Sequence, residues 1–112
     1  MGGTQALHIG PQNLSRFGAI AAMSAPCDVP DSEPFAKTQV NVLQKPADIN
    51  TRLQLFWLAC CREDDLIGRA KAVDQILTAH GVRHVWNETE GAHTWMTWRR
   101  HLAELAQLLF RR

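Results

Sequence analysis

The feature that most constrains the fold of this chain is a set of apolar runs without polar alternation. Residues 17–24 are Phe-Gly-Ala-Ile-Ala-Ala-Met-Ser, and residues 53–61 are Leu-Gln-Leu-Phe-Trp-Leu-Ala-Cys-Cys. Such runs are typical of strands buried on both faces, as in a parallel sheet. Residues 82–89 (Val-Arg-His-Val-Trp-Asn-Glu-Thr) predict a third strand. Because helical segments separate these runs, we predict an α/β fold with three parallel strands and right-handed crossovers.

The first half of the chain carries two weaker signals. Residues 3–10 predict a short helix that ends at Gly10 and Pro11. Residues 25–52 contain four of the five prolines, so we predict a mostly irregular connection there. Within it, a turn of helix at residues 46–49 fits the preference of proline for the first helical position.

The second half predicts two helices. The clearer one follows the second strand, with Asp65 as a cap at its start and Gly81 as its left-handed end. Its apolar positions recur at helical spacing: Leu66, Ala70, Val73, Ile76 and Leu77. The last helix, over residues 95–110, has Thr94 as its predicted cap. Its apolar stripe is Trp98, Leu102, Leu105 and Leu109.

Composition excludes several classes of partner. The 112 residues suit one small globular domain, with 46% hydrophobic and 21% charged residues. A net charge of +1 gives no reason to expect nucleic acid or an anionic membrane as a partner. No apolar run reaches the roughly 18 residues that a membrane span needs. The first residues also lack the basic start and apolar core of a signal peptide.

The three cysteines do not predict a metal site. Cys60 and Cys61 are adjacent in a predicted strand, so their side chains point to opposite faces and cannot bind one ion. No pair of histidines or cysteines has zinc-like spacing near a second pair. We therefore interpret Cys27, Cys60 and Cys61 as small apolar residues, and we predict no metal and no cofactor.

Two turns follow the carboxyl ends of predicted strands, where open α/β sheets place their chemistry. The first contains Asp64 and Asp65, and the second contains His93. A carboxylate after one strand and a histidine after the next is the order of the last two members of a Ser-Asp-His triad. The histidine must accept the nucleophile's proton, and the carboxylate must orient it. Alternatively, the acids cap a helix and His93 is an ordinary surface residue.

The start of the chain resembles part of a known motif. Met1-Gly2-Gly3-Thr4 leads into a predicted helix, as does the segment after the serine in Gly-x-Ser-Met-Gly-Gly, the nucleophile elbow of many esterases. In this alignment Gly2 is the last glycine of the motif and Met1 is its variable position. The serine is then expected directly before Met1.

Further segments extend the resemblance over nearly the whole chain. Residues 17–24, residues 55–60 leading to Asp64, and Glu-Gly-Ala-His-Thr-Trp-Met-Thr-Trp-Arg at residues 90–99 look like the putative-esterase family of α/β-hydrolases. That family includes feruloyl and acetyl-xylan esterases, enterochelin-type esterases and esterase-D-like enzymes. Its Gly-Gly-His-x-aromatic-x-x-Trp pattern matches residues 93–98, with Ala92 in place of the glycine before the histidine.

The resemblance implies a fold and a set of roles. Residues 1–112 would be the C-terminal portion of an α/β-hydrolase esterase domain. Asp64 would be the acid, with Asp65 the less favoured alternative, and His93 the base. The backbone N–H of Met1 would be an oxyanion donor. Trp95 is expected to bind substrate, whereas Trp98 is expected in the core.

The implied activity is that of a serine esterase, which hydrolyses carboxylic esters through an acyl-enzyme. The expected substrate is a small-molecule or carbohydrate-linked ester. Alternatively, the chain is an inactive truncated hydrolase that acts as a binding or assembly module, or an independent small α/β domain. The strand at residues 17–24 would form an unpaired edge, so we expect self-association there and exposure of Phe56 or Trp57. Ser24 is the first alternative nucleophile if the chain alone is active.

Overall fold

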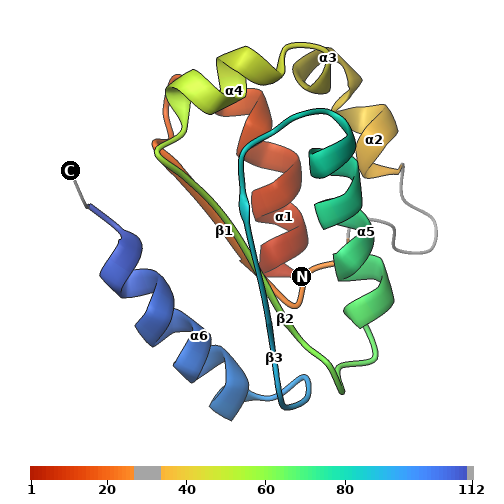
Figure 1. The fold of residues 1–112 in the computed structure, drawn as a ribbon, viewed down its shortest axis with the longest axis vertical. Helices are drawn as coiled ribbons and strands as arrows, with labels where there is room; N and C mark the ends of the chain where they lie inside the picture. The colour runs from red at the N-terminus through yellow and green to blue at the C-terminus, as the bar shows by residue number, and fades with distance from the viewer. Residues whose placement is uncertain (27–33, 111–112) are drawn as a thin grey trace.

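Three parallel strands form one sheet in the computed structural model, which describes residues 1–26 and 34–110. The order across the sheet is β1 (Ala19–Met23), β2 (Leu55–Cys61), β3 (Val85–Thr89) (Figure 1). The register pairs Leu58 of the central strand with Ala22 on one side and Trp86 on the other. The predicted three-stranded parallel sheet is confirmed, although each strand is shorter than the run that predicted it.

Helices cover both faces of the sheet. One face carries α1 (Gly2–Ile9) and α5 (Ile67–Ala79), and the other carries α6 (Trp95–Leu108) (Figure 1). The larger core lies under α1 and α5 and includes Leu7, Ile20, Phe56, Leu58, Val73 and Leu77. A smaller cluster under α6 contains Trp57, Ala59 and Leu105. Successive residues of β2 point to opposite faces, and both faces are covered, which is why the run is apolar throughout.

The predicted exposure of the central strand is wrong. Phe56 is 2% exposed and Trp57 is 1% exposed. Phe56 belongs to the core under α1 and α5, and Trp57 belongs to the cluster under α6. The sheet faces therefore have their helical cover within the described residues.

The long connection after β1 is more helical than predicted. It contains α2 (Phe35–Thr38), α3 (Val40–Leu43) and α4 (Pro46–Arg52). One apolar side chain from each helix, Phe35, Leu43 and Ile49, is buried in the larger core. Burial of these side chains stabilises helices that are too short to be stable by themselves. Proline does occupy the first position of α4, as predicted.

The first helix ends at Ile9 with Gly10 as its C-cap, as predicted. The backbone at Gly10 is still helical, with a φ of −57° and a ψ of −55°, and a 3₁₀ turn, η1 (Pro11–Asn13), continues directly from it. A Cβ at Gly10 would lie 2.7 Å from Cδ1 of Ile20. The glycine therefore lets the end of α1 approach β1 closely.

The caps of the two long helices differ from expectation. The N-cap of α5 is Leu66 rather than Asp65, and the backbone N–H of Leu66 donates to Asp64 Oδ1 at 2.9 Å. Gly81 has a positive φ of 74° after this helix, as predicted.

In α6, Thr94 is at the N-cap but makes no side-chain capping bond. The buried positions of α6 are Thr97, His101 and Leu105, whereas Leu102 is 51% exposed. The predicted stripe therefore agrees with the buried face at Leu105 but not at Leu102, and it missed Thr97 and His101 because they are polar.

Two of the cysteines are buried, as expected of small apolar residues, although Sγ of Cys61 also contacts polar atoms of Thr89 and Glu90. Cys60 and Cys61 are fully buried, while Cys27 lies outside the described residues. Burial, followed by the negative charge of Asp64, raises the pKa of the Cys60 thiol to about 11. Among the described helices, none is long and apolar enough to cross a membrane.

Candidate active site

Asp64 and His93 meet at the carboxyl edge of the sheet, as the strand order predicts. Asp64 lies in the turn after β2 and His93 in the turn after β3. Nδ1 of His93 is 2.8 Å from Oδ2 of Asp64. The Asp64 side chain is 0% exposed and the His93 side chain is 47% exposed. Within the described residues, Nε2 of His93 forms no hydrogen bond, so the ring is held at one nitrogen and open at the other.

The surroundings of Asp64 favour its carboxylate form. Burial opposes ionisation, but the backbone N–H of Leu66 and the ring of His93 both donate to the carboxyl group. The nearby Ser24 hydroxyl also lowers the pKa of Asp64. These hydrogen bonds outweigh burial and hold the pKa of Asp64 below its usual value of 3.8. Asp64 is therefore a buried anion next to the imidazole, the arrangement that fixes a tautomer and stabilises an imidazolium.

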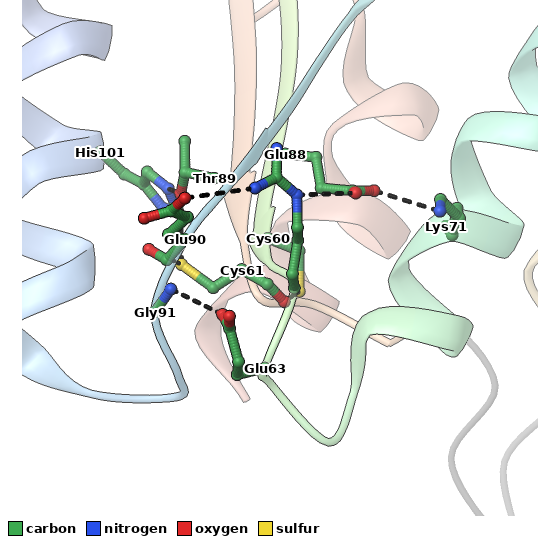
Figure 2. A network of polar contacts seen from close by, with 10 residues as sticks. Cys60, Cys61, Glu63, Lys71, Glu88, Thr89, Glu90, Gly91 and His101 are labelled. Carbon is green, nitrogen blue, oxygen red and sulfur yellow. Dashed lines mark hydrogen bonds and ion pairs between the residues drawn. The ribbon is translucent and has the colours of Figure 1, made fainter.

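Backbone contacts hold the two turns in register. The N–H of Gly91 donates to Oε2 of Glu63 at 2.8 Å, and the N–H of Glu63 donates to the carbonyl of Gly91 at 3.1 Å. Figure 2 shows the Glu63 side chain reaching Gly91 across the gap between the turns. The N–H of Arg62 also donates to the carbonyl of Thr89 at 2.8 Å. The residues just before Asp64 thus fix the backbone just before His93.

Charged residues flank the same edge (Figure 2). Glu88 pairs with Lys71 of α5 at 3.2 Å and with Arg62 at 3.5 Å. Arg62 also lies 3.8 Å from Glu90. The hydrogen bond from Lys71 lowers the pKa of Glu88. Exposed pairs such as these contribute little stability, so they orient the end of β3 without deciding the fold.

Ser24 and Trp98 complete the site, and sequence reasoning missed the contacts that they make. Trp98 lies edge-to-face with His93, with ring centroids 4.7 Å apart and an interplanar angle of 88°. Its indole N–H donates to Oγ of Ser24 at 3.1 Å. The interpretation of Trp98 as a core residue is therefore incomplete. Ser24 directly follows β1, so the rule that selected Asp64 and His93 also selects Ser24 when it is applied to the first strand.

Met1 and Trp95 have different environments from this cluster. The first turn of α1 lies beside the residues that follow β1, because Oγ1 of Thr4 donates to the carbonyl of Pro26 at 2.7 Å. Met1, just before that turn, is 96% exposed. Trp95 is 67% exposed at the start of α6, and the tryptophan in contact with the imidazole is Trp98. The roles expected of Met1 and Trp95 remain predictions.

The comparisons with known proteins concern the fold. No family model matches the chain. A ferulic acid esterase superimposes with a TM-score of 0.77 at 22% identity, covering 94% of this chain and 47% of that one. The crystal structure of S-formylglutathione hydrolase (FrmB) from Staphylococcus aureus, an apoenzyme, gives 0.74 at 15% identity, covering 96% and 47%.

The chain thus spans about half the length of each of these two esterases and shares their fold over that half. This confirms the predicted resemblance at the level of structure. The three parallel strands and flanking helices form part of an α/β-hydrolase fold.

Proposed function

We propose that this chain supplies the acid and the histidine of a carboxylic-ester hydrolase of the serine esterase type. The observation that carries the proposal is the 2.8 Å contact between a fully buried carboxylate, Asp64, and a half-exposed imidazole, His93. Its position at the carboxyl edge of the sheet, and the esterase names of two proteins with the same fold, support it. The substrate that we propose is a small-molecule or carbohydrate-linked ester.

In this mechanism Asp64 accepts the Nδ1–H of His93, which leaves Nε2 as the general base. Nε2 takes the proton of a serine hydroxyl while the serine oxygen attacks the ester carbonyl. The tetrahedral intermediate expels the alcohol, which receives that proton from His93. His93 then deprotonates a water molecule that attacks the acyl-enzyme, and the carboxylic acid leaves as the serine regains its proton.

The nucleophile in this proposal is a serine directly before Met1, as the resemblance to the nucleophile elbow implies. The backbone N–H of Met1 then donates to the oxyanion. The position of the first turn of α1 beside Pro26, just beyond the carboxyl end of β1, supports this assignment. Trp95, exposed at the start of α6, is the proposed contact for the substrate.

The test begins with the coding sequence upstream of Met1. We expect an in-frame Gly-x-Ser there, and the extended open reading frame should hydrolyse short aryl esters. His93→Ala and Asp64→Asn should each lower its kcat/KM by roughly 10⁴-fold. Asp65→Asn is the matched control, because Asp65 is exposed, and it should stay within about twofold because surface charges away from a site contribute little.

The chain without an upstream serine is the second arm. It should hydrolyse the same esters no faster than its own His93→Ala variant, because triad members act as a unit. A stop codon directly before Met1, or activity in the extended protein that is indifferent to His93, would overturn the proposal. Either result would favour a binding or assembly module.

A further inference from the structure

We propose that Ser24 and Trp98 are positioning residues for the Asp64–His93 pair, and that a hydrogen bond from Ser24 to Asp64 closes the four side chains into a ring. Three contacts run from Asp64 to His93, from His93 to Trp98 and from Trp98 to Ser24. The fourth side, from Ser24 to Asp64, is the proposed one, and it agrees with the lowering of the Asp64 pKa by Ser24. The inference rests on the proposed function for its meaning. The ring itself is a property of this chain that can be measured without any activity.

The hydroxyl of Ser24 connects Trp98 to Asp64 in the ring. Its oxygen accepts the indole N–H of Trp98 at 3.1 Å, which leaves its own proton to donate. That proton has two acceptors beside it, the Asp64 carboxylate and the Cys60 thiol. Because burial and the charge of Asp64 raise the pKa of Cys60 to about 11, Cys60 stays neutral and Asp64 is the charged acceptor. A charged acceptor makes the stronger hydrogen bond.

The carboxylate of Asp64 thereby has three donors from three segments. Leu66 holds Oδ1 at 2.9 Å and His93 holds Oδ2 at 2.8 Å. The hydroxyl of Ser24 is the third donor, and it brings the end of β1 into contact with the turn after β2. The pair is thus fixed by the carboxyl ends of all three strands.

The backbone at Ser24 argues that the side chain is needed there. Ser24 is 4% exposed and has a φ of 51°, a left-handed conformation that glycine adopts more readily. The sheet enforces this geometry, because the N–H of Ser24 donates to the carbonyl of Ala59 at 2.8 Å. A turn alone would be served better by glycine, whereas the hydroxyl gives serine a reason to be present.

Trp98 restricts the orientation of the His93 imidazole. Its ring meets the His93 ring edge-to-face at 4.7 Å, so His93 is held by Asp64 at Nδ1 and by Trp98 at the ring. Rotation of His93 away from Asp64 would break both contacts. The indole is itself oriented by Ser24, so the loss of Ser24 loosens acid and base together.

The decisive variant is Ser24→Gly, which removes the hydroxyl and also relieves the left-handed strain. We expect unchanged or higher thermal stability, together with an upward shift of the Asp64 pKa and faster exchange of the His93 Nδ1–H proton, both followed by NMR. Trp98→Phe keeps an aromatic ring but removes the N–H donor. It should also raise the pKa of Asp64, by a smaller amount than Ser24→Gly. Ser15→Gly, at an exposed serine, and Trp86→Phe, at a partly buried tryptophan that packs against the larger core, are the controls.

In the extended protein, Ser24→Gly should lower kcat roughly 10-fold or more with little change in KM. The substitution misplaces the base, His93, but leaves the contacts that bind the substrate unchanged. Unchanged Asp64 and His93 signals in Ser24→Gly would overturn the inference, whatever the activity of the protein. Unchanged Asp64 titration in Trp98→Phe would contradict the role of Trp98 as a positioning residue. If the extended protein shows no esterase activity but Ser24→Gly still changes the Asp64 and His93 signals, the proposed function fails and the four-residue ring remains supported.

Discussion

Glu63 and Gly91 bind each other twice, side chain to backbone at 2.8 Å and backbone to backbone at 3.1 Å. Glu63 immediately precedes Asp64, and Gly91 lies just before His93. This pair of contacts therefore sets the distance between the two turns before any contact between the acid and the histidine is made. The geometry depends on glycine, because the φ of Gly91 is 121° and a Cβ there would lie 2.8 Å from Oγ1 of Thr97.

Gly91→Ala should therefore destabilise the chain by roughly 1–3 kcal/mol, through left-handed strain and the clash with buried Thr97. Urea unfolding measures this change. Gly68→Ala is the matched control, because a Cβ at Gly68 meets nothing within 4 Å and its φ is not left-handed. That variant should be neutral or more stable by up to about 1 kcal/mol, since alanine is the better helix former. Equal effects at the two positions would contradict the role given to Gly91.

Asp64 should make the chain sensitive to acid. Its pKa is lower in the folded chain than its usual value of 3.8, so the unfolded state binds the proton first. The stability that Asp64 contributes is fully present above about pH 4 and is lost as the pH falls through the folded-state pKa. Asp64→Asn should be less stable than the parent at pH 7 and should lose less on acidification. Urea midpoints between pH 7 and pH 3 test this, and a parent and variant with parallel pH profiles would refute it.

His101 should produce a second pH dependence at higher pH. It is 1% exposed, its Nδ1 is a buried atom without a partner, and Nε2 is 2.7 Å from Oγ1 of Thr89. Burial lowers its pKa from 6.5, with Arg100 acting in the same direction and Glu104 opposing. The unfolded state then binds the proton more readily, so stability falls as the pH drops below about 6.5. His101→Gln should flatten this slope between pH 7 and pH 5, whereas His80→Gln, at an exposed histidine, should not.

The sheet could be predicted from short-range pattern, and the acid–histidine contact from that pattern together with the resemblance to the esterase family. Continuous apolar runs mark strands buried on both faces, and parallel strands bring the turns after Cys61 and Thr89 to one edge. The ring through Ser24 and Trp98 could not be predicted in this way. Its two members are 74 positions apart, and each has an ordinary local interpretation, as a turn residue and as an apolar helix residue.

The buried face of α6 was predicted only in part, for a related reason. Thr97 and His101 occupy it as polar residues, and His101 pairs with Thr89 of β3. Counting apolar residues at helical spacing therefore selected Leu102, which is exposed. The short helices α2 and α3 were missed because one buried residue in each holds them, and a single buried residue produces no periodicity.

The free edge of β1 should make the chain self-associate. β1 is an edge strand with no charged residue or proline among its five residues, and such edges pair with other strands. A groove of about 410 Å³ runs beside it between α1 and β1, lined by Ala6, Ile9, Phe17 and Ala21 among others. Ile9 is 55% exposed and Phe17 is 43% exposed. We propose a second copy of the chain as the occupant, because two-fold pairing joins two such edges antiparallel and covers both grooves.

Ala21→Pro tests this pairing without breaking the sheet. The N–H of Ser24 points to β2, so the two-residue period of a strand points the N–H of Ala21 to the free edge. Proline at this position removes an outward donor, and sedimentation velocity should show a dimer or larger species becoming a monomer. Ala22→Pro is the contrasting control, since its N–H points to β2 and its loss should unfold the chain. A parent chain that sediments as a monomer with a sharp thermal transition would show that the edge is protected in another way.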